Sequence, residues 1–283
     1  MGVRTPQEFY ANHFFESGIQ CGNFTFASIG SGDGAVEADV AKKLEEKGAT
    51  KYAFHLYELS PFQNAKASQR IERLGLKGEF FFHEANANEW SPDCKFSGIM
   101  AHHSLHHIQN LEHLFDQVYT SLNDNGSFVT CDMIGRNGHQ RWPEAYAIIN
   151  AFWHFLPEEK KVHSVFGWQS FDFRDHDCSS QDFEGIRAQD ILPLLTEKFW
   201  FSSFFAWGGL TDIFTGRSYG PNFSPECPED CLFIDLVDEL NEILLDLGAI
   251  KPTVICASMS KHKAHDCITY RDRYPRAMTR IPD

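Results

Sequence analysis

The stretch Phe26-Ala27-Ser28-Ile29-Gly30-Ser31-Gly32-Asp33-Gly34 decides the fold, because a short apolar run changes there into three glycines at alternate positions. The next residues, 35–44, have the composition of a helix. An apolar strand, a glycine-rich turn and the start of a helix are typical of the first βα unit of a nucleotide-binding sheet. Glycine permits positive φ and lets a ligand approach the bare backbone. We therefore predict that this turn holds a cofactor.

Strands and helices alternate after this turn. Apolar, strand-like runs alternate with helical patterns at a spacing that implies βαβ crossovers and a mostly parallel sheet. The second strand ends at Glu58, 24 positions after Gly34, where folds of this kind place an acidic residue that binds ribose hydroxyls. The predicted strands lie at 51–57, 79–83, 96–101 and 126–132, with helices at 61–74 and 111–122.

The alternation stops after Asp132. Residues 138–185 are rich in tryptophan and phenylalanine without a clean strand period, so we expect a helical, aromatic-rich cap inserted after the fifth strand. Regular structure returns at 188 and includes a helix from Pro228 with an apolar stripe of Leu232, Leu236, Leu240, Ile243, Leu244 and Leu247. The predicted division is an N-terminal helix or lid (1–22), an α/β core (23–138), the cap (139–187), the remainder of the core (188–262) and a C-terminal tail (263–283).

Composition limits the partners and the compartment. The formal charge of −14 argues against nucleic acid and against an anionic membrane surface, since both need clustered Lys and Arg. The most apolar segment, 199–214, is too interrupted to span a membrane, and the N-terminus lacks an apolar signal core, so we expect a cytoplasmic protein. The eight cysteines form no Cys-x-x-Cys pair and are expected to be reduced thiols. Cys227 and Cys231 lack the second pair of ligands that a zinc site requires.

By this order of elements the chain resembles the class I S-adenosylmethionine-dependent methyltransferases, from about residue 24 to residue 260. The glycine loop matches the family's first motif, Glu58 its ribose-binding acid, Asn86-Ala87-Asn88 its adenine-contacting segment, and His102 to Ile108 with Leu111-Glu112 its loop after the fourth strand. The resemblance implies a Rossmann-like seven-stranded sheet with an antiparallel terminal strand. It also implies that S-adenosyl-L-methionine is bound by Ser28, Gly30, Gly32, Asp33, Gly34, Glu58, Leu59, Asn86, Ala87 and His102.

Two positions depart from the family pattern. Ser28 stands where the family usually has an acid that organises the loop and the methionine amino group, so Asp33 or Glu37 is expected to replace it. Asn86 stands where many members have Asp, and we expect its side-chain oxygen to accept a hydrogen bond from the adenine amino group.

The histidines of His102-His103-Ser104-Leu105-His106-His107 form two pairs four residues apart, a spacing compatible with metal binding on a helix. The chain turns at the end of a parallel strand, however, and no run of acidic residues lies nearby. We therefore expect no metal, and instead backbone contacts with the cofactor, packing, and one imidazole that reaches the substrate.

The loop after the fifth strand should face the substrate, because ligands lie at the carboxyl ends of parallel strands. Its content suits substrate binding through Arg136, Asn137, Arg141 and Trp142, although a solvated turn fits the same residues. The segment 183–187 is either a substrate clamp or a helix entry with a structural arginine. A base for the reaction is expected among His139, His106 and His107.

The resemblance implies an enzyme, a methyltransferase that uses in-line transfer to methylate a small or medium-sized metabolite, acting as a monomer or homodimer. Three alternatives stay open: a different reaction of the same cofactor, such as a non-methyl transfer or a rearrangement; an NAD(P)-dependent oxidoreductase; and a non-catalytic cofactor-binding module. The looser glycine pattern Gly30-x-Gly32-x-x-Ala35 suits NAD, but the chain has no Tyr-x-x-x-Lys pair for short-chain dehydrogenase chemistry.

Overall fold

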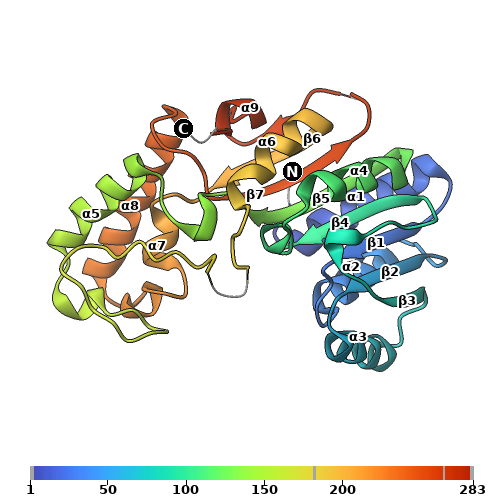
Figure 1. Cartoon of the computed structure of the whole chain (residues 1–283), viewed down its shortest axis with the longest axis horizontal. Helices are drawn as coiled ribbons and strands as arrows, with labels where there is room; N and C mark the ends of the chain where they lie inside the picture. Colours follow the sequence, from blue (N-terminus) through green and yellow to red (C-terminus); the bar gives the residue numbers. More distant parts are fainter. Residues whose placement is uncertain (1–2, 181–182, 264, 281–283) are drawn as a thin grey trace.

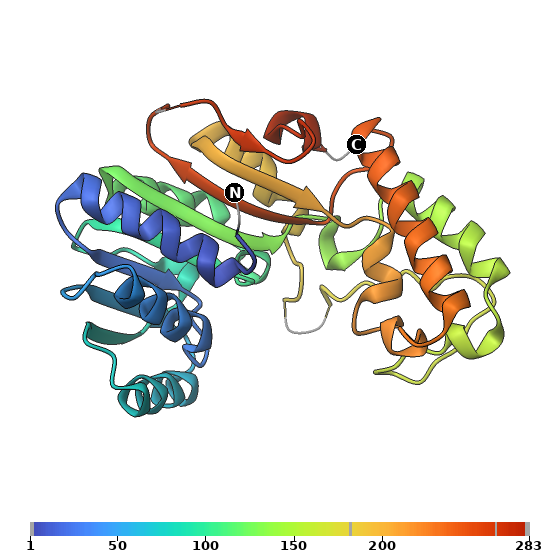
Figure 2. The same cartoon turned by 180° about the vertical axis from the view of Figure 1, so that it is seen from behind.

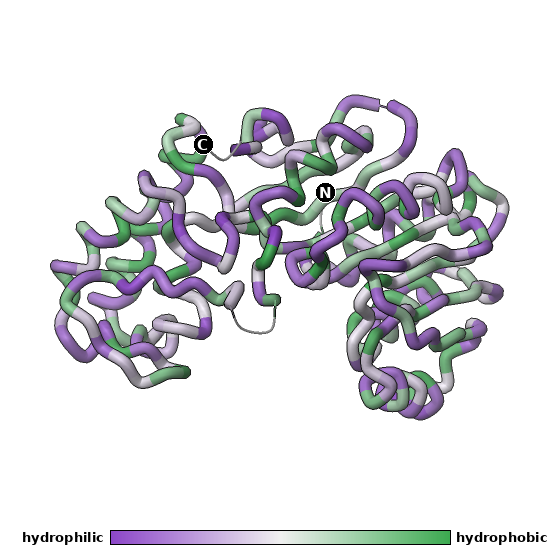
Figure 3. The backbone as a smooth tube through the Cα atoms, viewed as in Figure 1, coloured by the Kyte–Doolittle hydropathy of each residue, from purple (hydrophilic) through white to green (hydrophobic). Residues whose placement is uncertain are grey.

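The protein has two lobes, an α/β lobe built on one twisted sheet and a helical lobe (Figure 1). This computed structural model describes residues 3–180, 183–263 and 265–280. Figure 3 shows that apolar residues recur along the strands and along the helices of both lobes, while many of the connections are hydrophilic. The chain thus alternates core-forming and exposed segments.

The sheet has eight strands among the described residues, in the order β3-β2-β1-β4-β5-β7-β6-β8. Strands β1 to β5 pair in parallel, β7 is antiparallel to both β5 and β6, and β8 is parallel to β6. The predicted mostly parallel sheet with an antiparallel terminal strand is confirmed. The strands are β1 (Thr25–Ile29), β2 (Ala53–Glu58), β3 (Glu79–Glu84), β4 (Phe96–His102), β5 (Leu122–Met133), β6 (Trp200–Trp207), β7 (Val254–Ser260) and β8 (Ile268–Thr269).

The number of strands differs from the expected seven. The additional strand, β8, has only two residues and extends the sheet beyond β6. It lies within the segment that we assigned to a C-terminal tail, where so short a strand leaves no alternating pattern in the sequence.

Helices cover both faces of the sheet. One face packs against α1 (Pro6–Cys21), α2 (Ala35–Glu46) and α3 (Pro61–Leu74), and Figure 2 shows α1 lying along it. The other face packs against α4 (Leu111–Ser121), α6 (Ala188–Lys198) and α9 (Pro275–Met278). None of the helices in the described parts of the chain has the length and apolarity needed to cross a bilayer.

Local sequence sets where these helices begin. The Thr5 side chain accepts a hydrogen bond from the Glu8 amide at the start of α1, and Ser60 accepts one from the Gln63 amide at the start of α3. In both helices the next residue is proline, whose fixed φ suits the first helical position. These caps fix the residues at which α1 and α3 begin.

The helical lobe is larger than the predicted cap. It contains α5 (Pro143–Phe155), η4 (Glu158–Lys161), α7 (Thr211–Thr215), η5 (Gly220–Asn222) and α8 (Pro228–Asp246). A core centred on Trp153 and Phe214 joins α5, α7 and α8, so residues 211–250, which we had assigned to the α/β core, pack in the helical lobe. Of the stretch 188–262, only α6, β6 and β7 lie on or in the sheet.

The orientation of α8 also differs from the expected one. Its buried positions are Asp230, Val237, Asn241 and Leu245, spaced at whole turns. Much of the predicted apolar stripe is exposed, including Leu232, Leu236, Ile243 and Leu247. The helix carries apolar residues on two flanks, and the packing partner, which periodicity does not reveal, decides which flank is buried.

One pair of cysteines departs from the expectation of reduced thiols. Cys131 on β5 and Cys256 on β7 lie opposite each other in the antiparallel ladder, with their Cα atoms 4.1 Å apart, and form a disulfide. The two residues are 125 positions apart in sequence, so the pairing emerges only from strand order. Six further cysteines are free thiols.

Candidate active site

The predicted cofactor residues gather at one edge of the sheet. Because β1, β2, β3, β4 and β5 are parallel, their carboxyl ends meet there. The glycine loop follows β1, Glu58 ends β2, Asn86 follows β3, and His102 ends β4. Asp132 lies at the corresponding end of β5. The structure therefore brings the residues after four strands, and one acid that we did not assign to the site, to a common edge.

The glycine loop has the backbone shape that only glycine adopts easily. Gly30, Gly32 and Gly34 have φ of 69°, 53° and 68°. A Cβ on Gly30 would lie 2.6 Å from the Ser104 Cβ, whereas a Cβ on Gly32 would meet no atom within 4 Å. The loop thus packs closely against the turn after β4 on one side and leaves its backbone open at Gly32.

Glu58 ties the second strand to this loop. Its Oε2 accepts a 2.9 Å hydrogen bond from the Gly32 amide, and its Oε1 accepts one of 2.8 Å from the Ser60 amide. Each carboxylate oxygen retains a lone pair for a further donor. Next to it, Leu59 is exposed on the surface.

The structure distinguishes the two acids that were expected to compensate for Ser28. Ser28 Oγ donates a 2.6 Å hydrogen bond to Glu37 Oε1 on α2, and Glu37 is 2% exposed. Asp33 instead pairs with Arg70 at 2.5 Å and accepts a hydrogen bond from the Ala35 amide. Glu37 Oε2 is buried without a hydrogen-bond partner among the described residues. Burial raises the pKa of Glu37 to about 7.

The Asn86 side chain is hydrogen-bonded within its own turn. Its Oδ1 accepts hydrogen bonds from the Asn88 backbone amide at 3.0 Å and from Asn88 Nδ2 at 3.1 Å, which caps the turn η1 (Ala87–Glu89). Both lone pairs of the oxygen are therefore used within the turn. The expected acceptor for an adenine amino group is occupied, and the Asn86 amide NH₂ is the group that stays available.

His102 is a neutral, partly buried imidazole. Its Nδ1 lies 2.8 Å from the Tyr10 hydroxyl, which comes from α1. Burial, together with the neighbouring His103, lowers the pKa of His102 to about 4. Tyr10 is fully buried, and burial raises the pKa of its hydroxyl well above the usual range. The leading helix therefore contributes a side chain to the edge where the strands end.

A buried carboxylate orients the central histidine of the site. Asp132 Oδ1 lies 2.6 Å from His106 Nδ1, and both residues are almost completely buried. Asp132 Oδ2 accepts hydrogen bonds from the amides of Ser104 and Leu105 at 2.9 and 2.8 Å, which fixes the turn η2 (Leu105–His107). Burial opposes both charges, but their mutual hydrogen bond raises the pKa of His106 and lowers that of Asp132.

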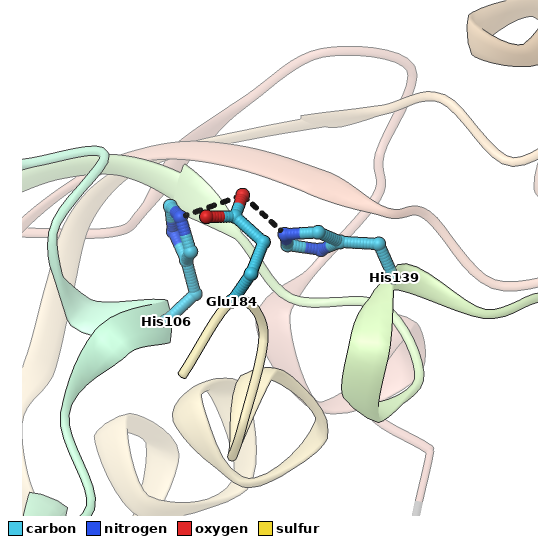
Figure 4. A group of neighbouring side chains, drawn as sticks. All are labelled: His106, His139 and Glu184. Atoms are coloured by element: carbon cyan, nitrogen blue, oxygen red, sulfur yellow. Dashed lines mark hydrogen bonds and ion pairs between the residues drawn. The ribbon is translucent and has the colours of Figure 1, made fainter. Parts of the chain in front are cut away.

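Three histidines surround one carboxylate beside this pair. Glu184 Oε1 lies 3.0 Å from His139 Nε2 and 3.7 Å from His106 Nε2, and Glu184 Oε2 lies 3.5 Å from His107 Nε2. Figure 4 shows His106 and His139 approaching the Glu184 carboxylate from opposite sides. Burial, followed by the charge of His106, lowers the pKa of His139. All three histidines predicted as candidate bases are thus together.

Backbone hydrogen bonds hold the three segments of this cluster. The Ile186 amide donates to the His106 carbonyl at 3.0 Å, and the Gly138 amide donates to the Gly185 carbonyl at 2.9 Å. A Cβ on Gly185 would lie 3.0 Å from the His139 amide nitrogen, and Gly185 has a φ of 68°, so a side chain at this position would be strained against the neighbouring segment. The turn η3 (Asn137–His139) ends at His139, which adopts a φ of 57°.

The residues that we predicted to bind substrate make several structural contacts. Asn137 exchanges hydrogen bonds with Gln189 of α6, and Arg136 Nη1 donates to the Arg141 carbonyl at 3.4 Å. Arg141 is buried and pairs with Asp212 of the helical lobe at 2.8 Å. Trp142 is buried beneath the Arg280 guanidinium, 4.5 Å from its ring centroid. Of these four side chains, Arg141 and Trp142 contribute to the junction of the lobes.

Sequence reasoning missed Tyr10, Asp132 and Glu184 as site residues. Asp132 carried a signal, since it ends a buried strand at the ligand-binding edge. Glu184 lies 45 positions after His139 in an irregular segment, and we had considered it only as part of a clamp or helix entry. We had argued against a metal site because no carboxylate lies near the histidines in sequence. That premise is wrong for the folded chain, where Glu184 lies beside them.

Comparison with known families agrees with the fold and with the position of the glycine loop. Residues 27–128, from β1 to β5, match a family model described as a methyltransferase domain. No curated protein matches the chain in sequence.

Solved structures provide a second comparison. Geranyl diphosphate C-methyltransferase from Streptomyces coelicolor, in complex with Mg²⁺, geranyl diphosphate and S-adenosyl-L-homocysteine, aligns with a TM-score of 0.50 and 15% identity over 90% of this chain and 79% of its own. The plantazolicin methyltransferase BpumL, in complex with S-adenosyl-L-homocysteine, aligns with a TM-score of 0.45 and 14% identity over 92% and 86%. An S-adenosylmethionine-dependent methyltransferase from Clostridium acetobutylicum aligns with a TM-score of 0.36 and 16% identity over 50% and 58%. The first alignment supports a shared fold.

Proposed function

We propose that this chain, which carries a class I S-adenosylmethionine-dependent methyltransferase domain, methylates a hydroxyl group of a small-molecule acceptor. The observation that carries the proposal is the buried Asp132–His106 pair, which adjoins Glu184 and His139 at the same edge of the sheet as the glycine loop. A hydroxyl group becomes a good nucleophile when a positioned base removes its proton, and this cluster can provide that base. A neutral amine attacks with its existing lone pair and does not need the base for this step.

The cofactor-binding residues fit S-adenosylmethionine. The unpartnered Glu37 Oε2, buried behind the glycine loop, suits the cationic amino group of the methionine part. Glu58 retains lone pairs for the ribose hydroxyls, and the open backbone at Gly32 allows close approach. Gly30 and Gly34 hold the loop in shape, and the Asn86 NH₂ and the Ala87 turn adjoin the end of β3, where adenine is expected.

When bound, the cofactor supplies a sulfonium methyl group, and the chain's own residues must align the acceptor and remove its proton. Asp132 holds the Nδ1 edge of His106, so the Nε2 edge faces Glu184 and His139. This arrangement sets the ring orientation and tautomer of His106 before the acceptor arrives. A positioned proton acceptor contributes about 10²–10⁴-fold to the rate. Alignment of the two reactants contributes more, about 7–11 kcal/mol in favourable cases.

The charge of the chain and its helical lobe favour a small acceptor. The formal charge of −14 disfavours nucleic acid. The helical lobe approaches the cluster through the η3 loop, and the ion pair between the buried Arg141 and the partly buried Asp212 ties that loop to α7. An acceptor bound between these elements meets Arg136 as a partly exposed cation, which suits an anionic or polar group on the molecule.

Calorimetric titration with S-adenosyl-L-homocysteine and S-adenosyl-L-methionine tests the cofactor assignment. We expect saturable binding to the wild type and at least tenfold weaker binding to Glu58→Ala, because the ribose acceptor and the tie to Gly32 are both lost. Glu84→Ala, which removes an exposed acid at the end of the neighbouring strand, is the matched control and should bind normally. Wild-type binding that Glu58→Ala leaves unchanged would remove the ribose assignment.

The reaction itself is tested with a library of hydroxylated metabolites. Formation of S-adenosyl-L-homocysteine together with a methyl ether on one library member supports the proposal. Cofactor consumption that yields a rearranged or differently alkylated product would contradict it and would favour another reaction of the same cofactor.

A further inference from the structure

The His106, His139 and Glu184 cluster has the composition of a metal site. The three residues come from η2, from η3 and from the segment before α6, and they share no sequence pattern. Their potential ligand atoms all lie within 4.8 Å of one another. Ligand atoms around one zinc ion lie roughly 3–4 Å apart, given metal–ligand distances of about 2.0–2.2 Å. The cluster is therefore close to the size that a bound ion requires.

The partners of the cluster also match those of metal ligands. A ligating histidine commonly donates its other ring N–H to a carboxylate, which fixes the ring and increases its basicity. Asp132 occupies that place for His106, at 2.6 Å from Nδ1, and is itself held by the amides of Ser104 and Leu105. The Nε2 lone pair of His106 is thereby directed toward Glu184 and His139 (Figure 4).

The backbone around the cluster is held in place before any ligand binds. Gly185, next to Glu184, is joined to Gly138, next to His139, and Ile186 is joined to His106. Phe183 and His139 adopt positive φ values of 58° and 57°, which non-glycine residues rarely adopt. Strained backbone conformations of this kind persist only where the surrounding structure imposes them, and they are concentrated at ligand-binding sites.

We propose that His106 Nε2, His139 Nε2 and the Glu184 carboxylate bind a divalent transition-metal ion. Two imidazoles and one carboxylate suit zinc, iron(II), cobalt or manganese better than calcium or magnesium, which prefer oxygen ligands. Three protein ligands leave at least one coordination position open, as in catalytic rather than structural sites. His107, 3.5 Å from Glu184 Oε2 and half-exposed, lies beside the cluster on the same turn.

The role of the ion rests on the proposed function. The open coordination position binds the hydroxyl oxygen of the methyl acceptor. Binding lowers the pKa of that hydroxyl, so its proton leaves to the solvent at neutral pH. The oxygen then forms a bond to the methyl carbon while the carbon–sulfur bond breaks, and the bonding pair stays on sulfur to give the neutral thioether. In this arrangement His106 and His139 hold the ion, which takes over from His106 the task of promoting loss of the proton, and Asp132 is a positioning residue.

Cobalt(II) provides a direct test, because its visible absorption reports coordination without any reaction. Purified, chelator-treated protein is titrated with CoCl₂, and the folded state is checked by circular dichroism and S-adenosyl-L-homocysteine binding. We expect one equivalent to give a spectrum of low-symmetry nitrogen and oxygen coordination. Glu184→Gln, which keeps the size of the side chain, should weaken binding at least tenfold, and Asp132→Asn about 10–100-fold.

His154→Asn is the matched control, since His154 is a half-exposed histidine paired with Asp172 in the helical lobe. It should bind cobalt like the wild type. Absence of stoichiometric binding by the folded wild type, or binding that Glu184→Gln and His139→Ala both leave unchanged, would overturn the proposal. Cobalt bound by the free cysteines can be distinguished from cobalt at this site. Thiolate coordination has its own charge-transfer absorption, and it would survive the Glu184 and His139 changes.

The two proposals fail in different ways. Cobalt binding without methyl transfer to any hydroxyl acceptor supports the metal site and contradicts the proposed function. Hydroxyl methylation by metal-free protein, unaffected by added chelator, supports the proposed function and overturns the metal site, and it leaves His106 and Asp132 as a metal-free base.

Discussion

Glu37 on α2 accepts a 2.6 Å hydrogen bond from Ser28 on β1, so that the acid beside the first strand comes from the following helix rather than from the strand. The Glu37 carboxyl is almost completely buried, and its second oxygen has no partner among the described residues. Asp33 in the glycine loop, Glu58 at the end of β2 and Tyr10 of α1 are the titratable groups that interact with it. We propose that Glu37, nine residues further along the chain, provides the acid that position 28 lacks.

The pH dependence of stability reports this buried acid. Burial raises the pKa of Glu37 from 4.5 to about 7, so the stability that its protonated form provides is complete below pH 4.5 and is lost as the pH rises through 7. Relative to Glu37→Gln, the wild type should lose up to about 3 kcal/mol of unfolding free energy between pH 5 and pH 8. Urea unfolding at several pH values measures the difference.

Glu46→Gln, an exposed change on the same helix, is the control for this experiment and should follow the wild type at every pH. If the wild type and Glu37→Gln show parallel pH profiles, Glu37 is ionised in the folded protein at neutral pH and the burial argument is wrong.

Asp132→Asn should damage both the fold and the reaction. Asp132 accepts hydrogen bonds from Ser104, Leu105, His106 and Met133, and an asparagine amide has only one oxygen to replace these acceptors. We expect a loss of about 2–4 kcal/mol in unfolding free energy. We also expect kcat to fall about 100-fold or more with little change in KM, because His106 loses its orientation.

Urea unfolding and steady-state kinetics on the accepted substrate measure the two effects. Asp124→Asn, an exposed change on the same strand, should be neutral in both. A stable Asp132→Asn protein with normal kcat would show that the carboxylate neither supports the turn nor orients the histidine.

The parts of the protein that the sequence predicted are those with a local cause. The glycine loop and the strand alternation depend on neighbouring residues, and the structure contains them. The residues that gather at the sheet edge followed from the rule that parallel strands end together. The Methyltransferase-domain match over 27–128 coincides with this locally encoded part.

The features that escaped prediction depend on tertiary contacts. Whether Asp33 or Glu37 would compensate for Ser28 was open, and Arg70, on another helix, engages Asp33. Which flank of α8 is buried depends on α5 and α7, and the partner of His139 lies 45 residues away. None of these relationships has a periodic or short-range signature, so sequence patterns alone could not reveal them.

The Cys131–Cys256 disulfide should be visible by alkylation. In denaturant without reductant, iodoacetamide should modify the six free cysteines, and after reduction it should modify all eight. Intact-mass spectrometry counts the adducts. The double variant Cys131→Ala, Cys256→Ala should have a free energy of unfolding about 2–4 kcal/mol lower than that of the oxidised protein. The reason is that the disulfide no longer closes a long loop in the unfolded chain. Cys94→Ala, an exposed thiol, is the control. Eight adducts before reduction would show that the pair is reduced in the purified protein.

The Arg141–Asp212 pair should contribute to stability because it is largely buried at the junction of the lobes. Arg141 Nη1 lies 2.8 Å from Asp212 Oδ2, which also accepts a hydrogen bond from Thr253 Oγ1 at 3.0 Å. Arg141→Ala leaves the Asp212 carboxylate without its cation, and we expect a loss of about 3 kcal/mol in unfolding free energy. Urea unfolding measures this loss. The exposed pair Lys198–Asp116 provides the matched comparison, and Lys198→Ala should cost less than about 1 kcal/mol. Equal effects of the two changes would mean that water reaches the Arg141 site in solution, and that the lobes are not held together there.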